Sequence, residues 1–345
     1  MLSYILKRFA LMLPTLLGAL TVTFAVIQFV PGGPVEQALA QARSRGVGGD
    51  TGGYRARGDS DTKQVEALKK LYGFDKPVHV RYFEMLKNFA SFNLGRSFSQ
   101  NKDVWQLIAE KLPVSISLGV WTFLVSYLIS VPLGILKAVR EGSSFDIVTT
   151  LAVLVGYAIP GFVLGVFLIV LFAGGTFWDV FPLRGLTSEN WATLSWPARV
   201  TDYFWHLAMP LTCLVIGSFA TMTFLTKNTF IEEMRKQYVL VARAKGLSQQ
   251  RVLWKHIFRN ALIPLVTGFP AAFIGAFFTG ALLIETLFSL DGLGLLSYES
   301  IVRRDYPVVL GSLYLFTLIG LVVKLVSDVI YTLVDPRVQF GAVGR

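Results

Sequence analysis

The sequence predicts an all-α polytopic membrane protein with six transmembrane helices and both chain ends in the cytoplasm. Two observations carry this prediction. The 345 residues are 53% hydrophobic and only 16% charged, with a mean hydropathy of +0.57, whereas soluble domains carry about 25% charge. Long apolar runs also alternate with short basic segments. This composition argues against a wholly soluble fold and against intrinsic disorder.

Six segments are long enough to cross the hydrocarbon core, which needs about 20 apolar residues of helix. The first five lack Asp, Glu, Lys and Arg, and the sixth is interrupted by Lys324 and Asp328. The spanning part of the third is expected to end near Phe172. The six segments are Phe9–Val30, Leu112–Leu136, Ile147–Trp178, Tyr203–Thr226, Asn260–Ile284 and Tyr306–Val334.

The distribution of basic residues sets the expected orientation. Segments 1–8, 137–146 and 227–259 and the tail after Val334 share one side, and they hold most of the short-loop Lys and Arg. The short segments of the other side contribute only four, Arg184, Arg199, Arg303 and Arg304. The positive-inside rule therefore places both ends in the cytoplasm. A cleaved signal peptide is the alternative for the start, but the first apolar run exceeds the usual length of about 7–15 residues.

The expected organisation has three parts, namely 1–30 with the first span, the periplasmic segment 31–111, and a transmembrane domain over 112–345. Within the periplasmic segment, residues 41–62 are rich in Gly, Arg, Ser and Asp and are expected to form a flexible insert, either a solvated tether or a docking arm. Residues 63–111 show helical spacing of apolar residues and predict amphipathic helices, interrupted at Asp75-Lys76-Pro77.

The basic loop 227–259 lies between the fourth and fifth spans. Apolar Tyr238, Val241 and Ala242, with the stem of Lys245, recur at helical spacing, and Gly246 is expected to end this short helix. A second helix is expected over Gln249–Arg259. A short helix of this kind fits a groove on a partner protein. A helix lying on anionic lipid, or a loop that only obeys the positive-inside rule, remains an alternative.

Several other functions receive little support from the sequence. Cys213 is the single cysteine and cannot form an internal disulfide, and His79, His206 and His256 fall in different predicted compartments. His206 and Cys213 are expected to be packing residues. The basic residues that give the chain its net charge of +10 are expected to contact the membrane surface and not nucleic acid. An ion-coupled secondary transporter remains the alternative class, although neither an internal repeat nor midplane acids are evident.

A series of motifs resembles the permeases of ABC importers in the dipeptide/oligopeptide family, closest to the branch that takes up oligopeptides and microcin C. The central one, in the loop 227–259, is Tyr238-Val239-x-x-Ala242-Arg243-Ala244-Lys245-Gly246-Leu247, followed by Arg259-Asn260-Ala261-Leu262. Others are Gly73-Phe74-Asp75-Lys76-Pro77, Leu94-Gly95-Arg96-Ser97-Phe98, Glu285-Thr286-Leu287-Phe288-Ser289, Arg304-Asp305-Tyr306 and Asp335-Pro336-Arg337.

The resemblance implies a multi-pass subunit of the bacterial inner membrane that imports oligopeptides delivered by a periplasmic binding protein. It implies a paralogous permease and two ATPase subunits as partners. The sequence has no G-x-x-x-x-G-K-[ST] loop, so ATP and Mg are expected on the ATPase subunits, with no cofactor, metal or catalysis on this chain. A permease for nickel or another small ligand is the alternative within the family. The implied coupling helix to the ATPase consists of Tyr238, Val241, Ala242, Arg243, Ala244, Lys245 and Gly246.

The chain departs from the family pattern in several places. The family's loop is called the EAA loop after a Glu-Ala pair, and here Leu240 and Val241 occupy those two positions. Gln237 replaces an Asp that could cap the helix, and the insert 41–62 is additional.

Three charges near or within the spans are candidates for the substrate path. Glu285 is expected either to meet a peptide amine or to make a helix-end or inter-subunit hydrogen bond, and Lys324 and Asp328 can pair four residues apart.

Overall fold

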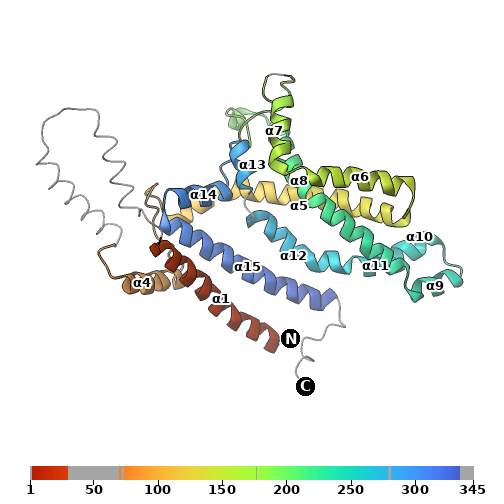
Figure 1. Cartoon of the computed structure of the whole chain (residues 1–345), viewed down its shortest axis with the longest axis horizontal. Helices are drawn as coiled ribbons and strands as arrows, with labels where there is room; N and C mark the ends of the chain where they lie inside the picture. Colours follow the sequence, from red (N-terminus) through yellow and green to blue (C-terminus); the bar gives the residue numbers. More distant parts are fainter. Residues whose placement is uncertain (1, 30–69, 71–73, 176, 279–280, 335–345) are drawn as a thin grey trace, which may run out of the picture. The chain divides into compact units, whose positions relative to one another are not determined.

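A computed structural model describes residues 2–29, 70, 74–175, 177–278 and 281–334. The predicted insert 41–62, residues 63–69 and 71–73 of the expected helical region, and the motif 335–337 lie outside these residues. Within the described ranges the chain is helical and contains no β-strand (Figure 1). The helices are α1 (Leu2–Phe29), α4 (Val78–Ala90), α5 (Val104–Val139), α6 (Ser144–Ala158), α7 (Gly161–Phe172), α8 (Trp196–Met234), α9 (Gln237–Ala244), α10 (Gln249–Val252), α11 (Phe258–Ala261), α12 (Ile263–Phe278), α13 (Leu282–Leu287), α14 (Leu293–Val302) and α15 (Tyr306–Val334), with a 3₁₀ turn η1 (Trp191–Thr193) and a π-helical turn η2 (Leu253–Ile257).

The long apolar helices account for most of the predicted spans. α1, α5, α8 and α15 are each long and apolar enough to cross a membrane. Prolines lie inside α1, α5 and α8, as they do in membrane bundles, where neighbouring groups satisfy the freed carbonyls. The predicted fifth span contains α12, which has 16 residues. The full count of six spans therefore stays a prediction.

The predicted third span is not one continuous helix. α6 and α7 meet at an angle of 90°. The break falls at Ile159-Pro160, where Ile159 is extended with φ −87° and ψ 117°. Proline disfavours the helical conformation in the residue before it, and here Ile159 is extended and the backbone turns. The expectation of a single run through Ile147–Trp178 is therefore wrong in its geometry.

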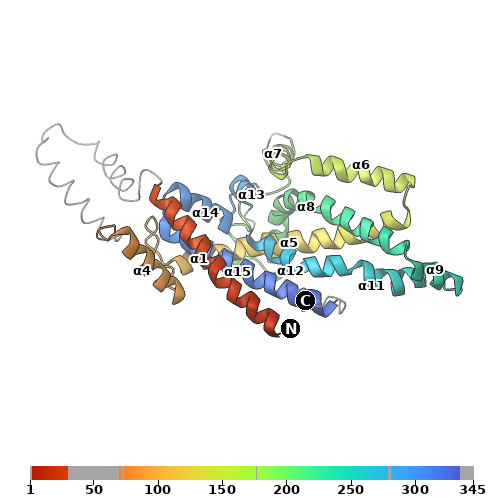
Figure 2. The same cartoon turned by 60° about the horizontal axis from the view of Figure 1, so that its bottom comes forward.

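The chain divides into two compact units, the first of which comprises residues 1–8, 111–295 and 320–345. Within this unit α6 and α7 both pack against α8, and α13 packs against α7 (Figures 1 and 2). Two glycines permit the contacts of α7. A Cβ on Gly161 would lie 2.6 Å from the carbonyl oxygen of Cys213, and one on Gly165 would lie 2.5 Å from Leu287. Cys213 is buried in this core, in agreement with its expected packing role.

The second unit comprises residues 9–110 and 296–319. Two of the sequence motifs meet in it. The carboxylate of Asp305 accepts hydrogen bonds from the hydroxyl of Ser97 (2.5 Å), from the hydroxyl of Ser99 (2.6 Å), and from the backbone N–H groups of Phe98 (2.9 Å) and Ser99 (3.0 Å). Asp305 is buried, and α15 begins directly after it. We call residues 97–99 with Asp305 the Asp305 clamp, which fixes the loop before α5 to the start of α15.

Candidate functional site

The short helix predicted in the basic loop is present as α9. It begins after Lys236, and the chain leaves it at Gly246, which has φ +78°. The N–H of Gly246 donates to the carbonyl of Arg243 (2.9 Å), and the N–H of Leu247 donates to that of Ala242 (3.4 Å). Glycine adopts this left-handed conformation without strain, which explains the helix end. The predicted termination at Gly246 is confirmed.

The apolar residues of α9 divide between a face buried in the permease and an exposed face. Val239 and Ala242 are buried against a hydrophobic cluster that includes Phe230 of α8 and Ile135 of α5. Val241 is 53% exposed and Leu240 60% exposed. Of the predicted apolar residues, Ala242 therefore faces the core, three positions after Val239, whereas Val241 lies on the outer side of the helix. Ala242 provides close approach to the protein's own α5 and α8.

The remaining residues of the predicted coupling segment point away from the core. Arg243, Ala244, Lys245 and Gly246 are all exposed. The surface that α9 and its end offer to another molecule thus comprises two large apolar residues, a small one and two basic ones. We call Leu240, Val241, Arg243, Ala244 and Lys245 the outer face of α9.

The side chain of Tyr238 connects the core-facing side of α9 to the end of α8. Its hydroxyl donates to Oε2 of Glu233 (2.7 Å), and Lys236 forms an ion pair with the same carboxylate. Glu233 is itself buried. Burial, together with the neighbouring Glu233, raises the pKa of Tyr238 to about 12, so the hydroxyl stays protonated and remains a donor. Tyr238 therefore links α9 to the end of α8.

The second predicted helix of the loop, Gln249–Arg259, is present as a continuous helical run that contains a π turn. It consists of α10, the π-helical turn η2 and α11. Val252, Ile257 and Ala261 are buried in the same cluster as Val239 and Ala242. The extra residue of the π turn keeps these three side chains on the core side. Sequence periodicity does not reveal such a turn.

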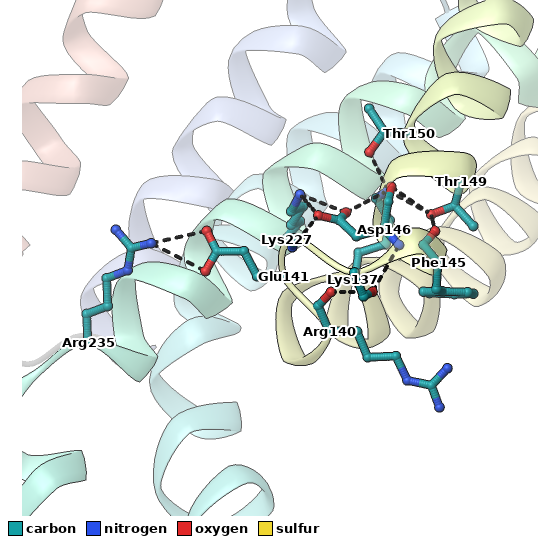
Figure 3. Close-up of polar contacts among 11 residues, drawn as sticks. Lys137, Arg140, Glu141, Phe145, Asp146, Thr149, Thr150, Lys227 and Arg235 are labelled. Atoms are coloured by element: carbon teal, nitrogen blue, oxygen red, sulfur yellow. Dashed lines mark hydrogen bonds and ion pairs between the residues drawn. The ribbon is translucent and has the colours of Figure 1, made fainter.

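A buried ionic cluster joins three helices close to this loop, and sequence reasoning missed it. Lys137 at the end of α5 has 0% side-chain exposure, and its Nζ lies 3.0 Å from Oδ1 of Asp146 at the start of α6 (Figure 3). The same Nζ donates to Thr149 (2.8 Å) and Thr150 (2.7 Å). Lys227 of α8 contacts both carboxylate oxygens of Asp146, at 2.8 and 2.7 Å. In the sequence Lys137 was only a positive-inside charge. We call Lys137, Asp146 and Lys227 the ionic cluster.

Glu285 is buried and binds the start of α14. It is 1% exposed, and its Oε2 accepts from the backbone N–H of Leu295 (2.7 Å) in the first turn of α14. Gly292 permits this approach, since a Cβ there would lie 2.6 Å from the carboxylate carbon. A carboxylate at a helix N-terminus satisfies unpaired N–H groups. Of the two predicted roles, the geometry supports the helix-end hydrogen bond.

Lys324 and Asp328 do not form the predicted pair. The carboxylate of Asp328 lies 3.2 Å from a guanidinium nitrogen of Arg8, near the start of α1. Lys324 is exposed and makes no ion pair within the described ranges. The pairing was wrong because it considered neighbours on one helix only, while Arg8 approaches from another helix.

Comparison with known proteins identifies the family. Residues 130–340 match the family described as "Binding-protein-dependent transport system inner membrane component". The chain belongs to this family of ABC-importer permeases. Over 98% of both chains, this permease is 53% identical to "Peptidoglycan transport system permease protein YejB" of Agrobacterium fabrum (strain C58 / ATCC 33970). It is 49% identical to "Inner membrane ABC transporter permease protein YejB" of Escherichia coli O157:H7, covering 98% of this chain and 99% of the relative.

A third relative lies further away. The permease is 33% identical to "Di/tripeptide transport system permease protein DppB" of Pseudomonas aeruginosa (strain UCBPP-PA14), over 98% of this chain and 99% of the relative. These full-length matches place it among the dipeptide/oligopeptide permeases. Membership makes it an integral inner-membrane protein that works with an ATPase and a substrate-binding protein. A chain of the inward-facing MetNI methionine ABC transporter covers 67% of this permease at 16% identity, with a TM-score of 0.48.

Proposed function

We propose that this permease forms part of the path through which an ABC importer takes up oligopeptides. The observation that supports a peptide substrate is full-length similarity to relatives named for peptidoglycan, di/tripeptide and oligopeptide transport. Peptides that carry a modification, such as a sugar or a nucleotide as in microcin C, belong to the same proposed substrate class. The external binding protein presents the peptide to the permease.

The proposed arrangement has six spans, with both ends and the loop 227–259 in the cytoplasm. This permease pairs with a paralogous permease and with two ATPase subunits, on which ATP and Mg²⁺ bind. The positive-inside distribution of Lys and Arg supports this orientation. In this arrangement α9 faces the ATPase, and the short segments with few basic residues face the binding protein.

The outer face of α9 is the proposed contact with the ATPase. Leu240 and Val241 are exposed apolar residues on a helix outside the long membrane-spanning helices. Exposed apolar residues beside basic ones are typical of a protein contact site. The core-facing side of α9 is fixed through Tyr238, Glu233 and the packing of Ala242. Closure of the ATPase dimer would therefore move α9 and α8 together as one body.

Co-purification and coupled ATP hydrolysis test this assignment. The variant Leu240→Asp/Val241→Asp puts two charges on the outer face, and we expect at least tenfold less ATPase in the complex purified in mild detergent. Peptide uptake should fall equally, with the permease still inserted. Gln250→Asp is the control, because it adds a charge at an exposed position of the same loop. Undiminished ATPase recovery with the double variant would contradict the contact.

A substrate panel tests the cargo separately. The loaded binding protein is mixed with the complex, and ATP hydrolysis is measured with a tripeptide, a pentapeptide, a peptidoglycan-derived peptide and Ni²⁺. We expect stimulation by one or more of the peptides. Stimulation by Ni²⁺ alone would favour the alternative of a nickel permease and leave the α9 contact unaffected.

A further inference from the structure

The second unit contains a pocket with a cavity volume of about 240 Å³. Its walls come from the end of α1, from α4, from the loop before α5 and from the start of α15. The wall residues used below are Phe24, Phe74, Arg81, Glu84, Phe98 and Tyr306. The pocket is smaller than those that enclose a drug-sized ligand, about 300–1,000 Å³. It is of a size for a small polar group, not for a whole peptide.

Arg81 gives the pocket a positive charge. One terminal nitrogen of Arg81 donates to the side-chain oxygen of Gln28 (2.7 Å), and the guanidinium carbon lies 4.7 Å from the centre of the Phe74 ring. The Nε of Arg81 is buried and has no hydrogen-bond partner. No carboxylate forms an ion pair with Arg81 among the residues that the structure describes. A partly buried cation without a counter-charge favours an anionic ligand.

The pocket also contains one acidic side chain, whose charge is already compensated. Glu84 forms an ion pair with Lys76 at 2.6 Å. Both side chains are about half exposed, so water screens this pair. The charge of Arg81 therefore determines the sign of the potential within the pocket.

The walls of the pocket are held in place by specific contacts. The Asp305 clamp fixes Phe98 through its backbone N–H and precedes Tyr306 directly. On the opposite side, the hydroxyl groups of Thr21 and Tyr82 are 2.6 Å apart, and the rings of Phe24 and Tyr82 pack at 5.3 Å. Arg81 thus lies in a cavity whose aromatic wall residues are held by these contacts.

The surroundings of the pocket favour a lipid over a soluble anion. α1 exposes Val22, Val26 and Phe29 near the pocket residues Phe24 and Gln28, and α4 exposes Phe83. In an integral membrane protein, an exposed apolar surface of this kind can contact acyl chains. We propose that this pocket binds the phosphate-bearing headgroup of an acidic phospholipid, with Arg81 as the ligand of the phosphate and the exposed residues of α1 and α4 against the acyl chains. The proposal is independent of the role of α9.

Native mass spectrometry of the full-length permease, in its complex and in mild detergent, tests this site. Phosphatidylglycerol and phosphatidylethanolamine are titrated separately, and the bound fraction is compared. We expect phosphatidylglycerol to bind at least fivefold more tightly, and Arg81→Gln to remove this preference. Glu84→Gln leaves Lys76 without its partner carboxylate, so it adds net positive charge at the pocket and should strengthen phosphatidylglycerol binding several-fold. Lys87→Gln, an exposed change on the same helix outside the pocket, should have no effect.

The outcomes separate the proposal from its alternatives. Equal binding of the two lipids, or equal losses for Arg81→Gln and Lys87→Gln, would overturn it. Arg81-dependent binding of a tripeptide carboxylate, with phosphatidylglycerol binding unchanged by Arg81→Gln, would also overturn it and assign the pocket to peptide. Should Arg81→Gln fail to assemble, the opposite response of Glu84→Gln still decides, since unchanged phosphatidylglycerol binding by that variant contradicts the proposal.

Discussion

At the scale of single residues, the ionic cluster depends on one carboxylate. Asp146 is the common partner of Lys137, which is fully buried, and of Lys227, which is mostly buried. Loss of Lys227 leaves the neutral pair of Lys137 and Asp146. Loss of Asp146 leaves two ammonium groups close together without a carboxylate between them. Removing one partner of a buried ion pair costs about 3–5 kcal/mol.

We therefore expect Asp146→Asn to destabilise the purified permease much more than Lys227→Met does. Thermal inactivation in detergent, followed by size-exclusion chromatography, measures the difference. The double variant Lys137→Met/Asp146→Leu should recover part of the stability, because Lys227 retains some exposure and can reach water. Equal destabilisation by Asp146→Asn and Lys227→Met would show that Asp146 is not the common partner.

Gly246 sets the direction in which the chain leaves α9. Its φ is +78°, and a Cβ at this position would meet no atom within 4 Å. The cost of a substitution is therefore conformational, about 1–2 kcal/mol for a residue with a side chain. We expect peptide uptake to decrease in the order Gly, Asn, Asp, Val at position 246, with all variants inserted, because Asn and Asp tolerate this conformation best. Normal uptake by Gly246→Val would contradict the requirement for the left-handed turn.

At the scale of elements, the contact between α7 and α8 depends on two glycines whose surroundings differ. The Cβ of an alanine at 161 would collide with a backbone carbonyl oxygen, whereas at 165 the nearest atom is the end of the Leu287 side chain. Glycine to alanine normally stabilises a helix by about 1 kcal/mol. Here we expect Gly161→Ala to lower the melting temperature clearly and Gly165→Ala to have a smaller effect. Differential scanning fluorimetry in detergent compares them, and a more stable Gly161→Ala would refute the close contact.

The packing of α9 makes a prediction about its two alanines. Ala242 is buried against α5 and α8, while Ala244 is exposed. Ala242→Leu overpacks the cluster, with a cost of about 1–3 kcal/mol. We expect it to reduce both stability and uptake, whereas Ala244→Leu should leave stability unchanged and alter only ATPase recovery. Limited proteolysis of the loop, together with co-purification, distinguishes the two. A stability loss for Ala244→Leu would mean that the face is assigned incorrectly.

Composition and local signals predicted several elements well. The extent of α15 follows from its apolar run, and the end of α9 follows from Gly246, whereas α5 and α8 extend beyond their predicted runs at both ends. The sequence also contained a signal for the turn between α6 and α7, since Pro160 restricts Ile159. The π turn η2 and the phase of α9 had no such signal, because they depend on how the loop packs on α5 and α8.

At the scale of the whole molecule, interactions between distant residues limited the predictions about charge. Lys137, Glu285 and Asp328 each have a partner that sequence spacing does not indicate. Helical spacing suggested a bond between Lys324 and Asp328, yet Arg8 lies 320 positions away in the chain and holds the carboxylate. The functional prediction was less sensitive to such distant contacts than the charge pairings were, because it depends on many motifs in a fixed order and not on any single contact.

The proposed orientation can be checked with single cysteines, since the only native thiol, Cys213, is buried and gives little background. Gln250→Cys and Glu189→Cys place thiols at exposed positions of two different loops. We expect a membrane-impermeant maleimide to label position 189 in intact spheroplasts and position 250 only after permeabilisation. The reverse pattern would invert the topology and remove α9 from the ATPase.

The ionic cluster also has a consequence for how the chain is made. Asp146 finds Lys137 nine residues earlier but Lys227 only 81 residues later. We therefore expect α5 and α6 to form a hairpin during synthesis, in which Lys137 and Asp146 already neutralise each other. The hairpin can enter the bilayer before α8 exists, and Lys227 then joins when α8 is inserted. The order of the three charges along the chain thus matches the order in which the membrane receives them.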